Sequence, residues 1–574
     1  MKFFSLLTFV LLFGFCAWGY NCKELYVKGH ADPRFPAGLD CKLEKKFDVS
    51  GVPVHIYQYT KDFPQHPEDL QFAYRATQVF HDVYNTIVRV NPELYPRLRF
   101  TGLNFILTDH PPEDTEIAKV QIGHAQEGEL CPIIVYAANL RKESPDYQKQ
   151  ELAHEIFHCV QDLVWQEKMN VPKAIRSWWS EGTAVWFSNL VYPSNNQESY
   201  WNASYSFDDN LVEQKEPYAA YLFFQSVSQS WLGLQGVISL IKDMPISGTS
   251  DDQAKAVLDT PSMNLLWHTF AEEITSSRIL DFNGKHIVTS VIGEPEEEDI
   301  EEGEDVLEWD LAPLTMQVTE LKVPAQSITY IENLTESYNN PISFRNSGAG
   351  MWGQLFPNWP YAIDTSCKKN THFVNMLSSY AGQNDSGVPE NFKVRIKSQK
   401  TECKCIDAEQ FDPCLYGNYK IDPKSIDNMF RRIFQDKKFT VVQSSGGYDL
   451  MITGTQRFNF TQTGFTAAVI LHDDDHGDIK ASVSLDGTTD AIAKHPKKGE
   501  LCFSDIGDEY NIKIRVEFPQ GVAESEQPYS HFQDLAAEGP MKYTCNSNEL
   551  TLLRPLPTGE DGATEWIPIV FKRK

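Results

Sequence analysis

Hydrophobic and polar positions in the first half of the chain follow two different periods. Strands are expected at residues 50–60, 100–107 and 131–137. Apolar residues recur at helical spacing in residues 67–90, 145–192 and 217–244. Because the strands come first and the longest helical segments follow, the pattern predicts a mixed sheet followed by a helical half.

The second half changes to short alternating runs that Gly, Asn, Asp and Pro interrupt, as at residues 326–332, 392–396 and 512–518. Alternation over so few residues is typical of antiparallel sheets arranged as a sandwich or a barrel. The segment 403–414 is expected to separate two such modules. The acidic segment 294–305, which precedes them, is typical of a solvated linker, and a calcium or partner site is the alternative.

Size and charge limit the possible classes of protein. The 574 residues are too many for one core, and at about 100–200 residues per domain they indicate three or four units. Hydrophobic residues make up 41% of the chain, which excludes wholesale disorder. The formal net charge of −28 argues against nucleic acid or an anionic membrane surface as the main partner, because both attract a basic surface.

The N-terminus resembles a secretory signal peptide. Lys2 precedes an apolar run at residues 3–18, and Ala17 and Gly19 place small residues where signal peptidase reads them. Residues 1–19 are therefore expected to be removed; an uncleaved anchor is the alternative, although the apolar run is shorter than the about 20 residues that a membrane span needs. No later segment is expected to span a membrane. The mature protein is expected to be secreted, or to reside in the lumen of the secretory or endolysosomal pathway.

The cysteines agree with export. Loss of Cys16 would leave ten of the 11 cysteines, an even number suited to disulfides in an oxidising compartment. Sequons for N-glycosylation fit the same compartment and occur at Asn202, Asn333, Asn384 and Asn459. The chain is thus expected to be a disulfide-bonded glycoprotein.

One segment carries the pattern of a metal site. Residues 144–146, Ser-Pro-Asp, make a strong helix start, with a capping hydroxyl, a proline in the first turn and an acid near the positive end of the helix dipole. In the helix that follows, His154 and His158 stand one turn apart on one face, where two neutral imidazoles can bind one zinc ion. Glu155 lies beside them, where a carboxylate can take a proton from zinc-activated water.

A catalytic zinc usually has a third protein ligand. The metzincin pattern would place Gly and His where this chain has Gln161 and Val164, which excludes that class. In the next helix, residues 174–187, Glu181 is the only acid, and a lone carboxylate among aromatic residues would be costly to bury without a cation. Pairing of Glu181 with Arg176 is the alternative. The predicted ligands of Zn²⁺ are His154, His158 and Glu181.

The chain carries two motifs, His-Glu-x-x-His at residues 154–158 and Trp-x-x-Glu-Gly-x-Ala at residues 178–184. Together they resemble the motifs of gluzincin zinc metallopeptidases, the peptidase MA-like group. The resemblance implies that Glu155 is the general base and that residues 131–137 form the edge strand along which a peptide backbone docks. It also implies an oxyanion donor on the helix that begins at Pro217, for which Tyr218 is favoured over Tyr221.

The chain departs from the group's patterns at two places. Thermolysin-like members have Asp four residues after the third ligand, where this chain has Val185, so another residue must orient a zinc-binding histidine. Asp162 is a candidate, and a solvated surface acid is the alternative. The exopeptidase motif Gly-x-Met-x-Asn is missing at residues 135–139, so endo- and exopeptidase both remain open. A Cys131–Cys159 disulfide that ties the expected edge strand to the histidine helix is a further hypothesis.

The expected function is that of a secreted zinc metallopeptidase, a hydrolase whose partners are peptide or protein substrates and whose base is Glu155. The alternative is a secreted binding or adhesion protein with an inactive zinc-peptidase-like scaffold. The oligomeric state and the substrate sequence stay open.

The expected fold class is an α+β zinc-peptidase-like domain followed by all-β domains, a sandwich and/or a lipocalin-like barrel. Residues 417–419, Gly-Asn-Tyr, resemble the Gly-x-Trp opening strand of lipocalin-like barrels, with Tyr in place of Trp. The expected boundaries are 1–19 for the signal peptide, 20–292 for the peptidase-like domain, 293–310 for the acidic linker, 311–405 for the sandwich-like domain and 406–574 for a barrel or second sandwich.

Overall fold

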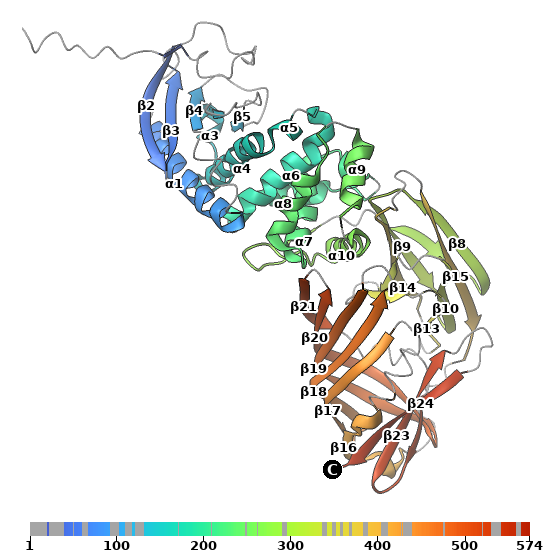
Figure 1. Ribbon diagram of the computed structural model, residues 1–574. Helices are drawn as coiled ribbons and strands as arrows, with labels where there is room; N and C mark the ends of the chain where they lie inside the picture. The colour runs from blue at the N-terminus through green and yellow to red at the C-terminus, as the bar shows by residue number, and fades with distance from the viewer. Residues whose placement is uncertain are drawn as a thin grey trace, which may run out of the picture. The chain divides into compact units, whose positions relative to one another are not determined.

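A computed structural model describes residues 20–21, 40–49, 51–59, 67–91, 103–108, 118–120, 131–169, 171–207, 209–246, 249–260, 262–289, 295–335, 341–346, 352–355, 357, 360–366, 370–382, 389–402, 411–425, 428, 439–473, 477–518, 521–529, 541–557 and 564–574. The expected signal peptide, the sequon at Asn384 and most of the expected separator at 403–414 lie outside these residues. The chain divides into two compact units (Figure 1). The first unit comprises residues up to 228, 234–257 and 277–291, and the second comprises 229–233, 258–276 and 292–574.

The first unit contains a six-stranded mixed sheet in the order β1-β2-β3-β4-β6-β5. Its strands are β1 (Tyr20–Asn21), β2 (Asp40–Val49), β3 (Val52–Tyr59), β4 (Leu103–Thr108), β5 (Ala118–Val120) and β6 (Cys131–Tyr136). β3, β4 and β6 are parallel neighbours, whereas β1, β2 and β5 join the sheet antiparallel. Every residue of β6 is buried, which explains its unbroken apolar sequence.

The prediction that residues 131–137 form the edge strand is wrong. β6 lies between β4 and β5, so among the described residues β5 is the last strand on that side of the sheet, and it pairs antiparallel with β6 through Lys119 and Ile134. The three residues of β5 are too few to show a period. Which strand lies at an edge also depends on pairing between distant segments, which the local pattern of β6 does not contain.

The long helices of the first unit lie within the predicted segments, and several short ones, such as the helix at residues 250–258, lie outside them. The α-helices are α1 (Pro67–Val90), α3 (Ala137–Leu140), α4 (Pro145–Val164), α5 (Gln166–Met169), α6 (Lys173–Val191), α7 (Tyr221–Gln229), α8 (Gly233–Asp243) and α9 (Ser250–Leu258). The 3₁₀-helices are η3 (Gln197–Ser204), η4 (Leu211–Glu213) and η5 (Pro217–Ala220). α4 begins as expected, because Ser144 Oγ accepts a hydrogen bond from the Tyr147 N–H at 3.2 Å. α4 packs against α1 and α6, which brings the two predicted motifs together.

The second unit begins with a β-sandwich. Its sheets have the orders β13-β10-β15-β8 and β12-β11-β14-β9-β7 and share one hydrophobic core. The strands are β7 (Glu296–Asp299), β8 (Gly303–Leu311), β9 (Thr315–Val323), β10 (Ser327–Asn333), β11 (Ile342–Asn346), β12 (Gly353–Leu355), β13 (Tyr361–Asp364), β14 (His372–Tyr380) and β15 (Glu390–Lys400). Helix α10 (Met263–Thr275) packs on β14, where buried His268 shares hydrogen bonds with Ser379 (2.7 Å) and Ser343 (2.8 Å).

The acidic segment that was expected to be a linker contains two strands. β7 pairs with β9 and β8 pairs with β15, so this segment supplies an edge strand to each sheet. Its acidic side chains stay exposed, and strand pairing needs only the backbone, so a high charge is compatible with sheet structure. Repelling charges on exposed edges also discourage association between sheets. The expected domain boundaries themselves stay a prediction.

The chain ends in a closed eight-stranded antiparallel barrel in the order β16-β17-β18-β19-β20-β22-β23-β24, with β21 added to β20. The strands are β16 (Gly417–Ile421), β17 (Phe439–Ile452), β18 (Arg457–Asp473), β19 (Gly477–Lys497), β20 (Glu500–Phe518), β21 (Gly521–Tyr529), β22 (Met541–Cys545), β23 (Glu549–Pro557) and β24 (Thr564–Arg573). The barrel confirms the predicted fold class.

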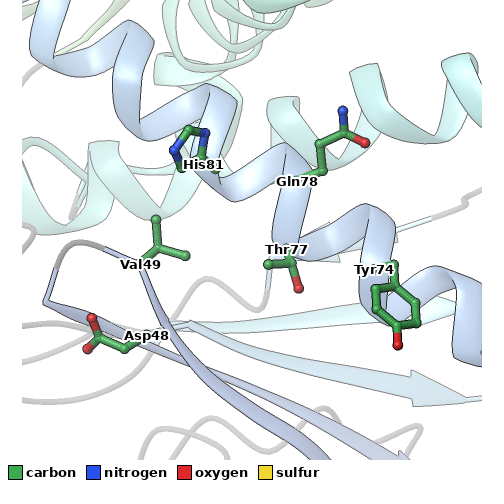
Figure 2. A pocket seen from close by; sticks show the side chains of 6 residues that line it. All are labelled: Asp48, Val49, Tyr74, Thr77, Gln78 and His81. Carbon is green, nitrogen blue, oxygen red and sulfur yellow. The ribbon is translucent and has the colours of Figure 1, made fainter.

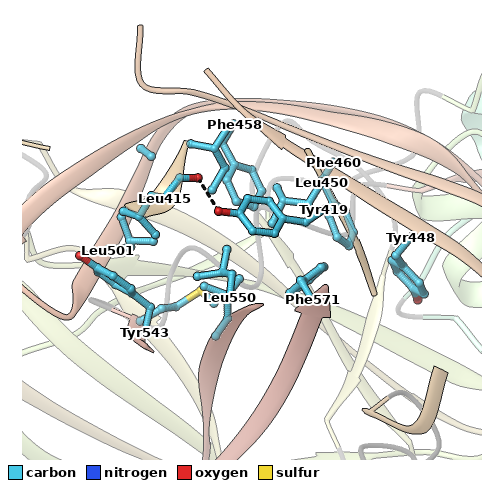
Figure 3. Close-up of a cluster of buried hydrophobic side chains, with 14 of the residues drawn as sticks. Leu415, Tyr419, Tyr448, Leu450, Phe458, Phe460, Leu501, Tyr543, Leu550 and Phe571 are labelled. Carbon is cyan, nitrogen blue, oxygen red and sulfur yellow. Dashed lines mark hydrogen bonds between the residues drawn. The ribbon is translucent and has the colours of Figure 1, made fainter. Parts of the chain in front are cut away.

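Tyr419, which stands where the lipocalin-like pattern has Trp, is fully buried in the core of the barrel (Figure 3). Its hydroxyl group contacts the carbonyl oxygens of Cys414 and Leu415. Arg573, on the last strand, donates a hydrogen bond to Tyr419 Oη at 2.8 Å, and its guanidinium carbon lies 5.2 Å from the ring centroid. The first and last strands of the barrel are therefore joined through this ring. Among the described residues of the whole chain, no helix is long and apolar enough to cross a bilayer.

Candidate metal centre

Helices α4 and α6 bring three potential ligands to one buried point in the first unit. His154 and His158 belong to α4, Glu181 belongs to α6, and all three are buried. His158 Nε2 lies 3.1 Å from His154 Nε2 and 3.0 Å from Glu181 Oε2, and His154 Nε2 lies 3.4 Å from the same oxygen. We call this group the metal triad. The sequence predicted its three members, and the structure places them together.

The spacing of the triad fits one metal ion. Neighbouring ligand atoms of a tetrahedron with zinc–ligand distances of about 2.0–2.1 Å lie about 3.3 Å apart. The three distances within the triad, 3.0 to 3.4 Å, match these edges. Two imidazole nitrogens and one carboxylate oxygen also form a donor set of catalytic zinc sites, which keep a fourth position open. The triad can therefore hold a metal ion.

The electrostatics of the triad by itself favour a positive charge at its centre. Burial acts to raise the pKa of Glu181, but the charge of His158 and hydrogen bonds from both histidines hold it well below the usual range. Burial acts to lower the pKa of His158, but the Glu181 carboxylate outweighs it and raises the value to about 9. A buried carboxylate thus attracts a proton to the ring beside it, and a metal cation would take the place of that proton.

Glu155 follows His154 on α4 and is also buried. Burial raises its pKa to about 7, although the charges of His158 and His154 act to lower it. A carboxyl group with a pKa near neutrality can both accept and return a proton. The predicted base therefore lies next to the triad in a setting suited to that role.

Gln161 is a functional candidate that the sequence analysis missed. Its Oε1 lies 2.8 Å from His158 Nδ1, so the ring can donate a proton there and keep Nε2 free for a metal ion. Its amide nitrogen donates to Ser180 O and Thr183 Oγ1 on α6, both at 2.9 Å. One side chain thus contacts a candidate ligand of α4 and joins it to the helix that carries Glu181.

Gln161, rather than the expected Asp162, therefore meets the His158 ring. Asp162 is buried, so the alternative of a solvated surface acid is wrong, while a role of Asp162 in orienting a histidine stays a prediction. Burial lowers the pKa of Arg176, and the negative charges of Asp162 and Glu181 oppose that shift. The N–H groups of Arg176 donate to Val171 O and Ser180 Oγ.

Gly182 fixes the position of the third candidate ligand. A Cβ atom at Gly182 would lie 3.1 Å from both Ala220 Cβ and Phe224 Cε2, closer than ordinary van der Waals contact. The absence of a side chain lets α6 approach η5 and α7. This close approach gives the Glu-Gly pair of the second motif a structural reason, because a larger residue would press α6 against Ala220 and Phe224.

Aromatic rings lie on the His154 side of the triad. The rings of His154 and Tyr218 are stacked with centroids 6.0 Å apart. Trp201 in turn stacks on Tyr218, with centroids 4.5 Å apart. Tyr200, which is 76% exposed, meets Trp201 edge to face at 4.7 Å. Tyr221, in contrast, is fully buried and donates its hydroxyl proton to Asn202 Oδ1. Of the two tyrosines considered, Tyr218 is therefore the one beside the triad.

The predicted Cys131–Cys159 disulfide is confirmed. It joins β6 to α4, with Cα atoms 5.9 Å apart, and Cys159 directly follows His158. Helix α4, which carries two of the candidate ligands, is thus covalently attached to the sheet.

A surface pocket of the first unit lies elsewhere. Figure 2 shows its lining, which comes from β2 and α1 and consists of Asp48, Val49, Tyr74, Thr77, Gln78 and His81. None of these residues belongs to the triad or carries one of the two motifs. The pocket therefore adds nothing to the metal centre.

The chain matches no protein-family model and no curated protein sequence. Among solved structures it is similar to PliG, a periplasmic inhibitor of g-type lysozyme from Aeromonas hydrophila (9% identity, 18% of this chain and 96% of that chain, TM-score 0.15). It is also similar to the extracellular region of zebrafish Gpr126/Adgrg6 (10% identity, 48% and 36%, TM-score 0.14). A third likeness is to a β-glucuronidase of Parabacteroides merdae (8% identity, 44% and 29%, TM-score 0.10). Similarities this low carry no argument about function.

Proposed function

We propose that the protein is a zinc-dependent peptidase of the gluzincin type. The observation that carries the proposal is the meeting of His154 Nε2, His158 Nε2 and Glu181 Oε2 at tetrahedral spacing, with Glu155 buried beside them. A structural pair of histidines would not need a buried carboxylate between them, since burial of an unpaired charge is costly. The sequence resemblance to gluzincins adds the type of reaction.

The proposed roles follow from the placement of the residues. A zinc ion held by the triad would supply a Lewis acid that makes water nucleophilic near neutral pH. Glu155 would take the proton of the attacking water at its carboxylate and return it to the leaving amine. Tyr218 would donate a hydrogen bond to the oxygen that becomes negative in the transition state. Gln161 would hold the His158 ring in the orientation that presents Nε2.

β5, the last described strand on that side of the sheet, is the proposed docking strand, in place of β6. An extended peptide can add to an exposed strand through backbone hydrogen bonds. β5 packs beside α4, the helix that carries both histidines, so a peptide added there would lie along the ligand helix.

The disulfides support the further proposal that the protein is exported and matures in an oxidising compartment. Cys131–Cys159 and Cys414–Cys545 each join distant segments, in the first unit and in the barrel respectively. Such bonds persist where thiols are not kept reduced.

The test combines metal analysis with a digest of a broad peptide library. The wild type is expected to contain one zinc ion per chain and to cleave, whereas Glu155→Gln should keep its zinc and lose cleavage by about 10²-fold or more, as expected for loss of an acid–base group. Glu167→Gln, an exposed acid on α5, is the matched control and should behave like the wild type. A wild type without zinc would refute the site. Stoichiometric zinc without cleavage would favour the alternative, a binding protein with an inactive scaffold.

A further inference from the structure

Lys173, the first residue of α6, reaches the metal triad from the surface. Its side chain is 63% exposed, yet Nζ lies 3.4 Å from Glu181 Oε1, on a side chain that is only 5% exposed. Glu181 turns its other oxygen, Oε2, toward the two histidines. The carboxylate therefore has one oxygen in the triad and the other facing this lysine.

The contact requires an unusual path for a lysine side chain. Glu181 lies eight positions after Lys173, about 12 Å along the helix axis, so both side chains must span part of that rise. Side chains on a helix lean toward its N-terminus, and Lys173 instead extends toward the C-terminus. Because the lysine end of this ion pair is exposed, the pair by itself contributes little free energy. The more direct cause is the poorly hydrated oxygen of Glu181, which attracts the nearest mobile cation.

We propose that Lys173 binds a carboxylate of the substrate beside the metal triad. The inference rests on the proposed function and adds a substrate class to it. A divalent cation in the triad would neutralise Glu181 and repel the ammonium group, because like charges this close interact strongly where water is partly excluded. The lysine and the metal site together then form a region of excess positive charge. An anionic group bound between them relieves that excess.

Two sources of a carboxylate fit this chemistry. One is an Asp or Glu side chain next to the bond that is cut, and the other is the free C-terminal carboxylate of a short peptide. The class of preferred substrate is therefore peptides that carry a carboxylate close to the scissile bond.

A pair of small chelating ligands tests the inference on the zinc-loaded protein. Acetohydroxamic acid and succinic acid monohydroxamate share the metal-binding group and differ by one carboxylate. The wild type is expected to bind the succinic compound about tenfold more tightly by calorimetry, equivalent to about 1.4 kcal/mol. Lys173→Arg should keep the difference and Lys173→Met should abolish it. Lys393→Met, which removes an exposed ion-paired lysine of the sandwich, should leave it unchanged.

Equal binding of the two compounds by the wild type would overturn the proposal, and so would lack of binding by both. A preference that survives in Lys173→Met would show that the lysine only pairs with Glu181. Zinc content is measured on every variant, so loss of the metal, which would refute the proposed function, is distinguished from loss of carboxylate preference.

Three peptides that differ only in where they carry a carboxylate then separate its two sources. One is neutral and amidated, one has a free C-terminus, and one has an internal Glu with an amidated end. The peptide with the matching carboxylate should show the lower KM, and Lys173→Met should raise that KM toward the neutral peptide's value while kcat changes little. Equal KM values for all three would contradict the proposal.

Discussion

Replacement of Gln161 by Leu is expected to weaken zinc binding without removing any proposed ligand. The change deletes the acceptor 2.8 Å from His158 Nδ1 and the two hydrogen bonds to Ser180 O and Thr183 Oγ1. The buried Nδ1–H group is then left without its partner, which costs about 1–3 kcal/mol. Loss of a residue that orients a metal-binding histidine typically lowers affinity by about 10–100-fold. We expect a loss of zinc affinity in that range.

Gln161→Glu separates the two tasks of the side chain. A carboxylate can still accept from His158 Nδ1, but it cannot donate to Ser180 O or Thr183 Oγ1. Zinc affinity should therefore stay within about threefold of the wild type, while the free energy of unfolding falls by about 1–3 kcal/mol for the imperfectly paired buried groups. The assays are zinc titration against a competing chelator and urea unfolding of the metal-free protein.

The matched control is Gln148→Leu. Gln148 is a buried glutamine on the same helix, and its amide donates to Leu140 O at 2.7 Å and Glu143 O at 3.0 Å. Its loss should lower stability and leave zinc affinity unchanged relative to the folded wild type. If Gln161→Leu and Gln148→Leu have the same zinc affinity as the wild type, Gln161 does not orient His158 and the reasoning fails.

Three further predictions concern the first unit and the glycosylation sites. Burial raises the pKa of Glu198 from 4.5 to about 7, so between these pH values the folded state binds more protons than the unfolded state, and stability falls as the pH rises. Urea unfolding should show that Glu198→Gln is up to about 3 kcal/mol more stable than the wild type at pH 8 and no more stable at pH 4.5. Equal gains at both pH values would contradict this prediction. Gly182→Val should cost about 1–3 kcal/mol of stability by overpacking against Ala220 and Phe224, and it should also weaken zinc binding. If titration against a chelator shows an unchanged zinc affinity, α6 can move without disturbing Glu181. Peptide mapping should find Asn202 and Asn333 unglycosylated, because both are buried and their amide nitrogens donate to the carbonyls of Val288 and Leu355; a glycan on either residue in the folded protein would conflict with the structure.

Much of the metal centre was accessible from the sequence because its signals are local. The capped start of α4 and the spacing of His154 and His158 depend on one helix, and the helix period fixes which residues share a face. Glu181 could be chosen because it is the only acid in an apolar helix. The meeting of α4 and α6 was inferred from a resemblance, and in the structure the two helices pack together and Gln161 joins them by hydrogen bonds to Ser180 and Thr183.

The parts that the sequence did not reveal depend on contacts between distant segments. An amide such as Gln161 has no chemical signature until its neighbours are known, whereas the acid beside it, Asp162, attracts attention by its charge. The edge strand was misplaced because β5 is short and its pairing with β6 is not visible in either segment. The acidic strands β7 and β8 were taken for a linker because charge dominates their composition, while strand formation there depends on partners in β9 and β15.

The Cys131–Cys159 bond gives an order to the maturation of the protein. It attaches α4 to the sheet at the residue next to His158, so the position of that ring depends on a covalent bond that forms only under oxidising conditions. Zinc that meets the chain before oxidation would meet free thiolates as well as histidines, and thiolates are strong zinc ligands. Correct loading would therefore follow disulfide formation. In a reducing host Cys131 and Cys159 would stay thiols next to the triad, so the choice of expression compartment becomes part of any assay of zinc binding.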